Sequence, residues 1–546
     1  MKKVFCLGIA LSSVFLFVIV LSKPVQAQKK PIEARWAVEM VIADIDPANQ
    51  RHNWEYLAAL NLYDTLIFPN VEKGYIPWIA ESWKMSPDGK TYTFQLKKGI
   101  PFHDGTEITA EDVAFSMDRI LALGTKVSTY FKSVQPRTTK ALDKHTVQFN
   151  LTKRDPSFMQ ALFLFKIVNK NLVLKNKAEG NFGEFGDYGV KFLLNHDAGS
   201  GPYLAVESKV GDHLTMKRFN EYPFVQWKPN SIDLITVYMI PEMVTIAMKL
   251  KMGEVDMVAW SLDSKIQREL QNNPNFKIEE DTLPAPWQIV INNKKKPLDD
   301  INVRKAIAYA FDRHTVMDLI LAGGKPTAGP LPPELQGGCT DIATYPFDLE
   351  KARDMLKKSK YSADELKSFP MEIAAAAGSE RFQKVALLTS SNLKKIGLNA
   401  QVKVVRYVDI CQYQAKPETA YHMVVFYHPA LVPHPYQYLI FYTPEGAGTA
   451  WPPGGIYYEN PEVTEWINKG NNASDLKEQR KYYCQAQKQI ALDSPVVWSH
   501  TELRLMPKWR YVKGWQYPVG SMFFELRHDR YTMDTDDPMF KKNHGW

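Results

Sequence analysis

The segment from Ile79 to Arg119 constrains the fold more than any other part of the sequence. It contains the turn residues Ser86-Pro87-Asp88-Gly89, in which Pro presets φ and Gly can adopt φ > 0. Residues 91–97 then alternate apolar and polar side chains, which is the period of a half-buried strand. Thr109-Ala110-Glu111-Asp112 resembles a capping box with Asp in place of Glu, and apolar residues follow it at helical spacing. The segment therefore predicts a hairpin-like unit followed by an amphipathic helix.

The N-terminus has the pattern of a secretory signal peptide. Two lysines at 2–3 precede an apolar run over 4–21, and the small residues Val25 and Ala27 predict cleavage after Ala27. An uncleaved membrane anchor is the less favoured alternative, because Gly and Ser residues dilute the apolar run. Cys6 lies inside that run and no Cys stands directly after the predicted cleavage site, so a lipobox is absent. We therefore expect a freely soluble exported protein, which in a bacterium is periplasmic.

The length of the chain predicts more than one lobe. It has 546 residues, whereas a single hydrophobic core stops growing at roughly 250–300 residues. Hydrophobic residues make up 45% of the sequence, which is enough apolar material for packed cores. Without Lys2, Lys3 and Lys23 of the predicted signal peptide, the formal net charge falls from +7 to +4, which is too small and too dispersed to indicate binding to nucleic acid or to an anionic membrane surface.

Three cysteines follow the predicted cleavage site: Cys339, Cys411 and Cys484. Because their number is odd, at most one intramolecular disulfide can form among them and one thiol is left over. An exported protein permits a disulfide, and the sequence leaves all three pairings open. There is no C-x-x-C motif, so redox chemistry is not predicted.

A series of motifs follows in order along the chain. They are GSGPY at 199–203, LTMKRFNEY at 214–222, GEVD at 253–256, the long segment 298–324, DLEKARDMLK at 348–357, and a strand–helix–strand pattern at 369–405 that predicts a parallel βαβ unit. Together with residues 79–119, these motifs resemble the solute-binding proteins of the oligopeptide, dipeptide and nickel class that serve ABC importers, also described as family 5 of extracellular solute-binding proteins. The resemblance covers nearly all of the chain after the signal peptide.

This resemblance implies an α/β fold. The expected architecture is a two-lobed periplasmic-binding-protein clamp, type II-like, with an extra α+β domain and a ligand cleft between the lobes. The first lobe of this family is discontinuous in sequence. The predicted parts are a signal peptide at 1–27, lobe I at 28–60, 199–288 and 506–546, an extra domain at 61–198, and lobe II at 289–505.

The resemblance also implies a receptor rather than an enzyme. Its two lobes are expected to close about hinge strands on a solute that contacts both. The closed form then docks on the membrane permease and ATPase subunits of an ABC importer. A monomer without a cofactor is implied. A peptide-class solute is the main expectation, and an oligosaccharide or a nickel or other metal chelate is the alternative.

Residues 425–439 bear on the choice of ligand. Peptide-binding members of the family use an Asp in a W-x-x-D-Y-x-D-P-like segment to pair with the α-ammonium of the peptide. Here Pro433-His434-Pro435 stands where Pro-Asp-Pro would be, and no acidic residue occurs between Glu418 and Glu445. A buried amine needs a countercharge. Recognition of a free N-terminus therefore requires an Asp or Glu from the other lobe.

The histidines of the same region raise a metal hypothesis. His422, His428 and His434 are spaced six residues apart, which on a straight strand is about 20 Å. The prolines between them could bring His428 and His434 together, but two imidazoles make an incomplete site for most metals. We therefore expect surface or packing histidines and no metal, and we keep His428 and His434 as a weak metal alternative.

Aromatic rings and one arginine are the candidate ligand contacts. Flat rings offer stacking area for sugars, aromatic solutes or peptide side chains, although a chain with 13 Trp, 26 Tyr and 27 Phe buries most of its rings in cores. Arg381, at a predicted helix start, could hold a carboxylate bidentately, whereas a solvated arginine is the more common case. The candidates are Trp54, Trp260, Trp287, Arg381, Tyr427, His428 and Trp451.

An exported hydrolase is the alternative from another class. The sequence contains no G-x-S-x-G elbow, no H-E-x-x-H motif, and no Walker or G-x-G-x-x-G loop. A glycosidase would need only two carboxylates that are distant in sequence, which no motif would show. A structural or chaperone role is a third possibility, and ligand-induced closure would count against it.

Overall fold

The computed structural model describes residues 30–546 apart from 40, 51–52, 71–73, 260–261, 263, 322, 333–334, 336, 378, 429–433, 450–451, 474 and 515–526, and gives the backbone alone at 53–54, 69, 74, 264–265, 281 and 283. The chain divides into two units, Met1–Pro31 and Ile32–Trp546, and all elements below lie in the second. The predicted signal peptide at 1–27 lies outside the described residues. None of the described helices is both long enough and apolar enough to cross a membrane.

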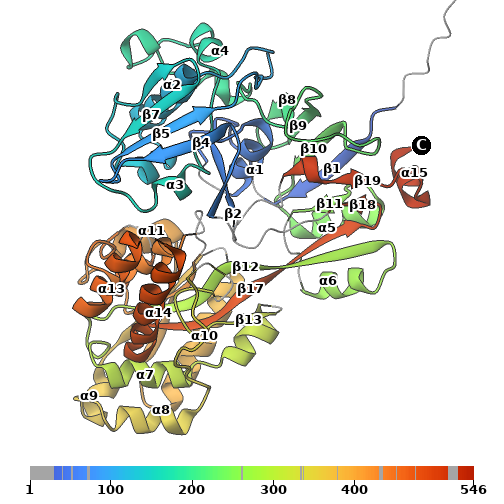
Figure 1. Ribbon diagram of the computed structural model, residues 1–546. Helices are drawn as coiled ribbons and strands as arrows, with labels where there is room; N and C mark the ends of the chain where they lie inside the picture. The colour runs from blue at the N-terminus through green and yellow to red at the C-terminus, as the bar shows by residue number, and fades with distance from the viewer. Residues whose placement is uncertain are drawn as a thin grey trace, which may run out of the picture. The chain divides into compact units, whose positions relative to one another are not determined.

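A mixed eleven-stranded sheet organises the second unit (Figure 1). Its strand order is β15-β14-β16-β12-β17-β11-β1-β10-β9-β8, with β13 paired to β17. The strands are β1 Glu33–Val38, β8 Tyr203–Lys209, β9 His213–Arg218, β10 Leu234–Met239, β11 Met257–Val258, β12 Phe276–Ile291, β13 Gly324–Pro326, β14 Met371–Ala376, β15 Ala400–Val405, β16 Met423–Tyr427 and β17 Val496–Trp509.

Two long strands, β12 and β17, join the two halves of this sheet. They pair antiparallel from Phe276 opposite Trp509 to Val290 opposite Val496, with register shifts between Thr282 and Gln288. β17 continues into the first half through β11, and β12 continues into the second half through β16. The boundaries predicted at 288/289 and 505/506 fall inside β12 and β17, so both strands run from predicted lobe I into predicted lobe II. The exact domain boundaries stay predictions.

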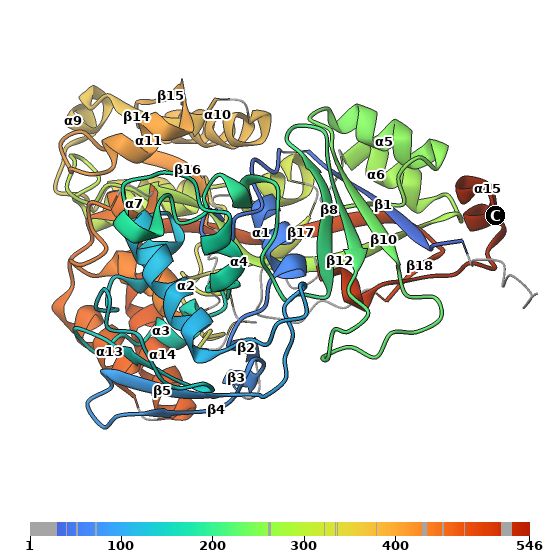
Figure 2. The same ribbon diagram turned by 90° about the horizontal axis from the view of Figure 1, so that it is seen from above.

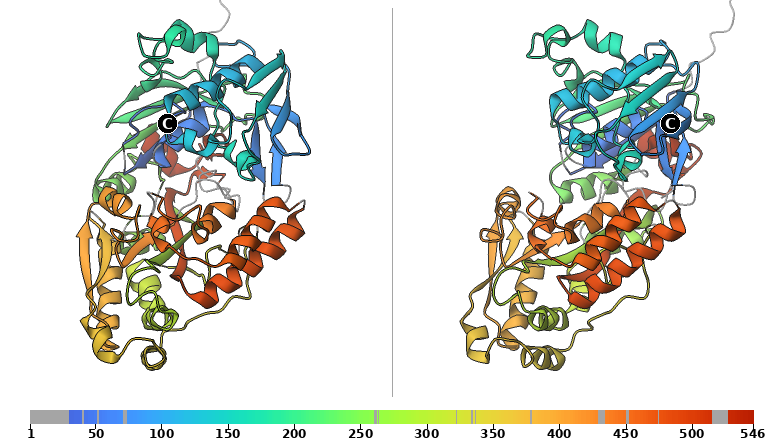
Figure 3. Two further views of the ribbon diagram at one scale, coloured as in Figure 1. Left: turned by 90° about the vertical axis from the view of Figure 1, so that its left-hand side faces the viewer. Right: turned by 60° about the vertical axis from the view of Figure 1, so that its left-hand side comes forward.

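Apolar side chains form separate cores at the two ends of the long strands. One core takes its buried residues from Ile32–Leu270 and from Met506–Phe540. Two further cores lie within Trp287–Trp498. In both views of Figure 3, the helices α13 (Pro461–Asn472) and α14 (Leu476–Asp493) of the second region lie side by side. The protein thus has the two-lobed α/β architecture that the resemblance implied.

The segment that opened the sequence analysis forms a separate small sheet. Its strand order is β4-β5-β7-β6, and the predicted strand appears as β5 with Tyr92, Phe94 and Leu96 buried. The predicted helix appears as α2, where the Thr109 backbone N–H donates to the Asp112 carboxylate at 2.9 Å. The strands outside the large sheet are β2 Ile67–Asn70, β3 Gly74–Pro77, β4 Ala80–Met85, β5 Thr91–Leu96, β6 Lys140–Asp143, β7 Thr146–Asn150, β18 Val512–Lys513 and β19 Thr532–Met533.

The predicted βαβ unit is also present. β14 and β15 pair in parallel from Met371 opposite Ala400 to Ala376 opposite Val405, and α10 connects them (Figure 2). The remaining helices are α1 Asn53–Leu62, α2 Ala110–Leu123, α3 Phe158–Ala161, α4 Lys170–Lys175, α5 Met243–Met252, α6 Ser264–Gln271, α7 Ile301–Ala310, α8 Leu349–Leu356, α9 Ala363–Ser368, α10 Glu380–Lys395, α11 Tyr407–Tyr413, α12 Tyr436–Leu439 and α15 Pro538–His544.

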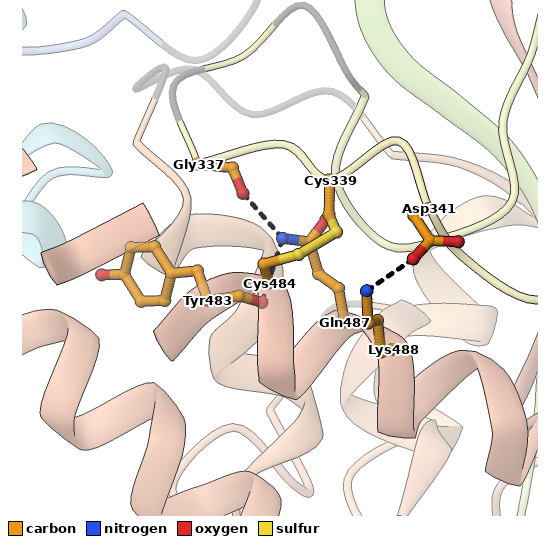
Figure 4. The surroundings of a disulfide bond; sticks show 7 residues. All are labelled: Gly337, Cys339, Asp341, Tyr483, Cys484, Gln487 and Lys488. Atoms are coloured by element: carbon orange, nitrogen blue, oxygen red, sulfur yellow. Dashed lines mark hydrogen bonds and ion pairs between the residues drawn. A yellow bond between two sulfur atoms is a disulfide. The ribbon is translucent and has the colours of Figure 1, made fainter. Parts of the chain in front are cut away.

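A disulfide between Cys339 and Cys484 selects one of the three pairings that the sequence allowed (Figure 4). It attaches the loop around Cys339 to α14, and Cys411 remains a free thiol. The Gln487 side-chain amide donates to the Gly337 carbonyl at 2.7 Å, so a hydrogen bond fixes the same loop beside the disulfide. The bridge therefore stabilises the second lobe only.

Candidate ligand-binding site

Three of the sequence-predicted ligand residues come together in the second lobe. Trp287 lies on β12 and Tyr427 at the end of β16, where the two residues are directly opposite in the antiparallel register. Opposed residues of an antiparallel pair project from the same face of the sheet, and the two ring centroids are 5.7 Å apart. Arg381, in the first turn of α10, places its guanidinium carbon 5.3 Å from the centroid of the Trp287 ring. β12, β16 and α10 thus bring the three side chains into one cluster.

Glu502 completes this cluster and was not predicted from the sequence. It lies on β17, where its carboxylate accepts a hydrogen bond from Arg381 Nη2 at 2.6 Å and another from Trp287 Nε1 at 3.1 Å. The Arg381 side chain is 39% exposed and that of Glu502 is 5% exposed. The Arg381 side chain is therefore partly accessible, whereas its anionic partner is buried. A single Glu on a strand gives no sequence signal for such a role.

Tyr427 adds a buried, protonated hydroxyl to the cluster. Burial and the nearby Glu502 carboxylate hold the pKa of Tyr427 well above its ordinary range, so the phenol keeps its proton. Its hydroxyl is buried and forms no hydrogen bond with any residue that the structure describes. Arg381 lies near this phenol and is paired with the carboxylate of Glu502. The cluster thus combines a partly exposed guanidinium, a buried carboxylate and a neutral hydroxyl donor.

The two histidines of the metal hypothesis are packing residues of the described structure. His428 is 5% exposed, and its ring centroid lies 5.0 Å from Tyr438 and 5.3 Å from Phe441. Burial lowers the pKa of His428 to about 3 and that of His434 to about 4, so both imidazoles are neutral at pH 7. No group of three or more His, Cys, Asp or Glu side chains suited to a metal ion occurs among the described residues.

The other predicted contacts cannot be placed in the same way. Trp260 and Trp451 lie outside the described residues, and for Trp54 only the backbone, in α1, is described. Within the described part, the sequence-predicted contacts that join the cluster are therefore Trp287, Arg381 and Tyr427. Phe382 also packs on Trp287 at 4.8 Å between ring centroids, which helps to fix the indole.

Comparison with known proteins identifies the family. Residues 74–449 match the family described as bacterial extracellular solute-binding proteins, family 5 Middle. The probable D,D-dipeptide-binding periplasmic protein DdpA of Escherichia coli K12 is 27% identical over 82% of this chain and 83% of its own length. The glutathione-binding protein GsiB of Pectobacterium atrosepticum is 25% identical over 92% of this chain and 94% of its own length.

Solved structures agree with this assignment at the level of the fold. The periplasmic binding protein DppA of Helicobacter pylori, in complex with the peptide STSA, superposes with a TM-score of 0.73. At 23% identity the match covers 92% of this chain and 99% of that one. Proteins of this family bind solutes for ABC importers and are not enzymes. The chain belongs to family 5 of the bacterial extracellular solute-binding proteins.

Proposed function

We propose that this protein is a periplasmic receptor for a solute that bears a carboxylate, with short peptides as the first class to consider. The observation that carries the proposal is the side chain of Arg381, which is 39% exposed and whose guanidinium lies over the Trp287 ring and bonds to Glu502. A planar guanidinium that is already held by two partners loses little conformational entropy when it binds a carboxylate. The Tyr427 hydroxyl would donate a further hydrogen bond to the same anion.

The relatives are compatible with this ligand class. Dipeptides and glutathione, which appear in the names of the two relatives above, both carry carboxylates. The segment 425–439 lacks the acidic residue that would pair with a peptide α-ammonium. In the described cluster, a cation is instead the group directed outward. We therefore infer that this receptor gains more of its affinity from an anionic end of the solute than from a free amine.

The transport role follows from the long strands. We infer that the lobes close about β12 and β17, whose pairing is interrupted between Thr282 and Gln288. A solute that contacts both lobes favours the closed state by its higher affinity for that state. The closed monomer then delivers the solute to the permease and ATPase subunits of an ABC importer. A cleavable signal peptide at 1–27 would supply the periplasmic location.

Isothermal titration calorimetry tests the carboxylate. The probes are Ala-Ala-Ala and its C-terminal amide, and the variants are Arg381→Gln and, as a matched control, Arg406→Gln. Arg406 also lies at the start of a helix beside an acidic partner, but its side chain is 76% exposed. Hydrogen bonds to charged groups are worth about 1.5–3 kcal/mol, so R381Q should weaken binding of the free acid by roughly 10- to 150-fold. Equal binding of acid and amide, or R381Q with wild-type affinity, contradicts the proposal.

Native mass spectrometry of the protein as purified tests the other solute classes. A co-purified mass that fragments as a peptide supports the proposal. A series of hexose increments would replace it with an oligosaccharide, and a nickel isotope pattern would replace it with a metal chelate. The described residues give the metal alternative no preformed site.

A further inference from the structure

Lys166 is a buried cation without a hydrogen-bond partner. It lies in the loop between α3 and α4, is 1% exposed, and its ammonium forms no hydrogen bond with any described residue. Its Nζ lies 4.9 Å from the ring centroid of Phe163 and 5.8 Å from that of Phe68. Burial lowers the pKa of Lys166 to about 7. An ammonium in such surroundings is costly unless an anion compensates it.

Arg527 presents a second unused donor beside the same ring. It is 1% exposed, and its guanidinium carbon lies 5.5 Å from the Phe68 centroid. Nε and Nη2 donate to the Asp529 carboxylate at 2.8 and 3.1 Å, and Nη2 also donates to the Tyr222 hydroxyl at 3.1 Å. Nη1 is buried and forms no hydrogen bond with any described residue. Lys166 Nζ and Arg527 Nη1, neither of which has a hydrogen-bond partner among the described residues, thus lie near the same ring.

The nearby carboxylates already have other partners. Asp64 accepts hydrogen bonds from Trp78 Nε1 at 2.7 Å, from the Tyr222 hydroxyl at 2.9 Å and from the Ser200 hydroxyl at 3.2 Å. Asp529 is engaged by Arg527. The charge of Asp64 is near enough to oppose the lowering of the Lys166 pKa, but no ion pair or hydrogen bond joins Lys166 to either acid among the described residues. One anion bound by both Lys166 Nζ and Arg527 Nη1 would satisfy both donors.

The two candidate anion sites lie in different lobes. Phe68, on β2 (Ile67–Asn70), and its neighbour Phe163 belong to the core of the first lobe. The Arg381 cluster belongs to the opposite lobe, on β12, β16, β17 and α10. Each lobe thus offers a cationic group.

We propose that Lys166 and Arg527 bind a second carboxylate of the solute, so that the receptor selects solutes with two separated carboxylates. This inference rests on the proposed receptor function and adds the chemical class of its ligand. Arg381 binds one carboxylate and the Lys166–Arg527 pair binds the other. A dianionic solute then gains an ionic contact in each lobe, which favours the closed state over the open state.

A first experiment tests the anion site without knowledge of the solute. Sodium acetate replaces sodium chloride at constant ionic strength, and the melting temperature is measured for wild type, Lys166→Met and Lys175→Met. Lys175 is an exposed lysine of α4 and serves as the matched control. Acetate should raise the melting temperature of wild type and K175M but not that of K166M. K166M should fold, because it replaces a buried ammonium that has no described hydrogen bond by an apolar side chain of similar length. An equal response of K166M and wild type overturns the anion site.

A second experiment tests whether the anion belongs to the solute. Glutathione, with two carboxylates, and Ala-Ala-Ala, with one, are titrated calorimetrically into the same variants. K166M should weaken glutathione at least tenfold and leave Ala-Ala-Ala within twofold. A response to acetate with unchanged glutathione affinity means an adventitious ion only and overturns the dianion proposal. If wild type binds neither probe but responds to acetate, the proposed peptide-receptor function is wrong. The proposed contact of Lys166 and Arg527 with the solute is then refuted as well.

Discussion

The buried histidine His428 should make the stability of the protein depend on pH in a measurable way. Burial lowers its pKa from the ordinary value near 6.5 to about 3 in the folded state. Between these two values the unfolded chain binds a proton that the folded protein does not. His428 therefore leaves the stability unaffected above pH 6.5 and lowers it as the pH falls from 6.5 toward 3. His422, His434, His500 and His528 have pKa values lowered in the same direction, with burial as the main cause.

The loss of stability that His428 causes follows from the pH range over which only the unfolded chain binds the proton. One pKa unit corresponds to about 1.4 kcal/mol, so moving from pH 7 to pH 5 should cost about 2 kcal/mol through this residue. Glu39 acts in the opposite sense, because burial raises its pKa to about 7 and its folded form takes up a proton over the same range. A comparison of wild type with His428→Phe removes this common background. Phenylalanine suits the site because the rings of Phe426, Tyr438 and Phe441 surround His428.

Urea unfolding followed by tryptophan fluorescence at pH 7 and pH 5 gives the four free energies of unfolding. The loss between the two pH values should be about 2 kcal/mol smaller in H428F than in wild type. His314→Phe is the control, because it replaces an imidazole whose side chain is 80% exposed. If H428F loses as much stability as wild type between pH 7 and pH 5, the neutral buried state of His428 is wrong.

Two further predictions concern stability alone. The Cys339–Cys484 bridge closes a loop of 145 residues, so replacing both cysteines by serine should cost about 5 kcal/mol in the chain-entropy account, measured by urea unfolding, and dithiothreitol should destabilise wild type to the same level. Arg119 and Asp46 form a buried ion pair with contacts of 2.8 and 2.5 Å, so Arg119→Met should cost about 3–5 kcal/mol by leaving a buried carboxylate unpaired, and adding Asp46→Asn should restore part of that loss.

Local signals in the sequence were sufficient for the elements that depend on nearby residues. The alternation over 91–97 became β5, and the box at Thr109–Asp112 became the start of α2. The pattern at 369–405 became the parallel pair of β14 and β15 around α10. In each case the deciding interactions lie within about 40 residues, so turn residues, periodicity and caps specify them.

Features that depend on distant pairing were not predictable. The disulfide joins residues separated by 145 positions, and the sequence offered two equally permitted alternatives. Glu502 meets Trp287 across 215 positions because β12 pairs with β17. Lys166 follows the apolar residues of FLF at 163–165 and has no pattern of its own, and Arg527 reaches it from the C-terminal part of the chain. The pairing of strands that are far apart in sequence decides which charged residues come into contact. This pairing cannot be derived from local patterns in a single sequence.

Two residues of the Arg381 cluster lie on the strands that connect the two lobes, which we propose as the hinge of closure. Trp287 and Glu502 lie on β12 and β17, and the pairing of these strands shifts register twice between Thr282 and Gln288. Such bulges bend a strand and change the direction of its side chains. The residues at the break include Pro284 and Pro286, which lack a backbone N–H and cannot donate to the ladder. The β12–β17 ladder is therefore interrupted beside the place where the indole and the carboxylate hold Arg381. A solute bound to this guanidinium and to the opposite lobe would act on the connecting strands next to these register shifts, so we expect a small number of ionic contacts to favour closure without rearranging either core.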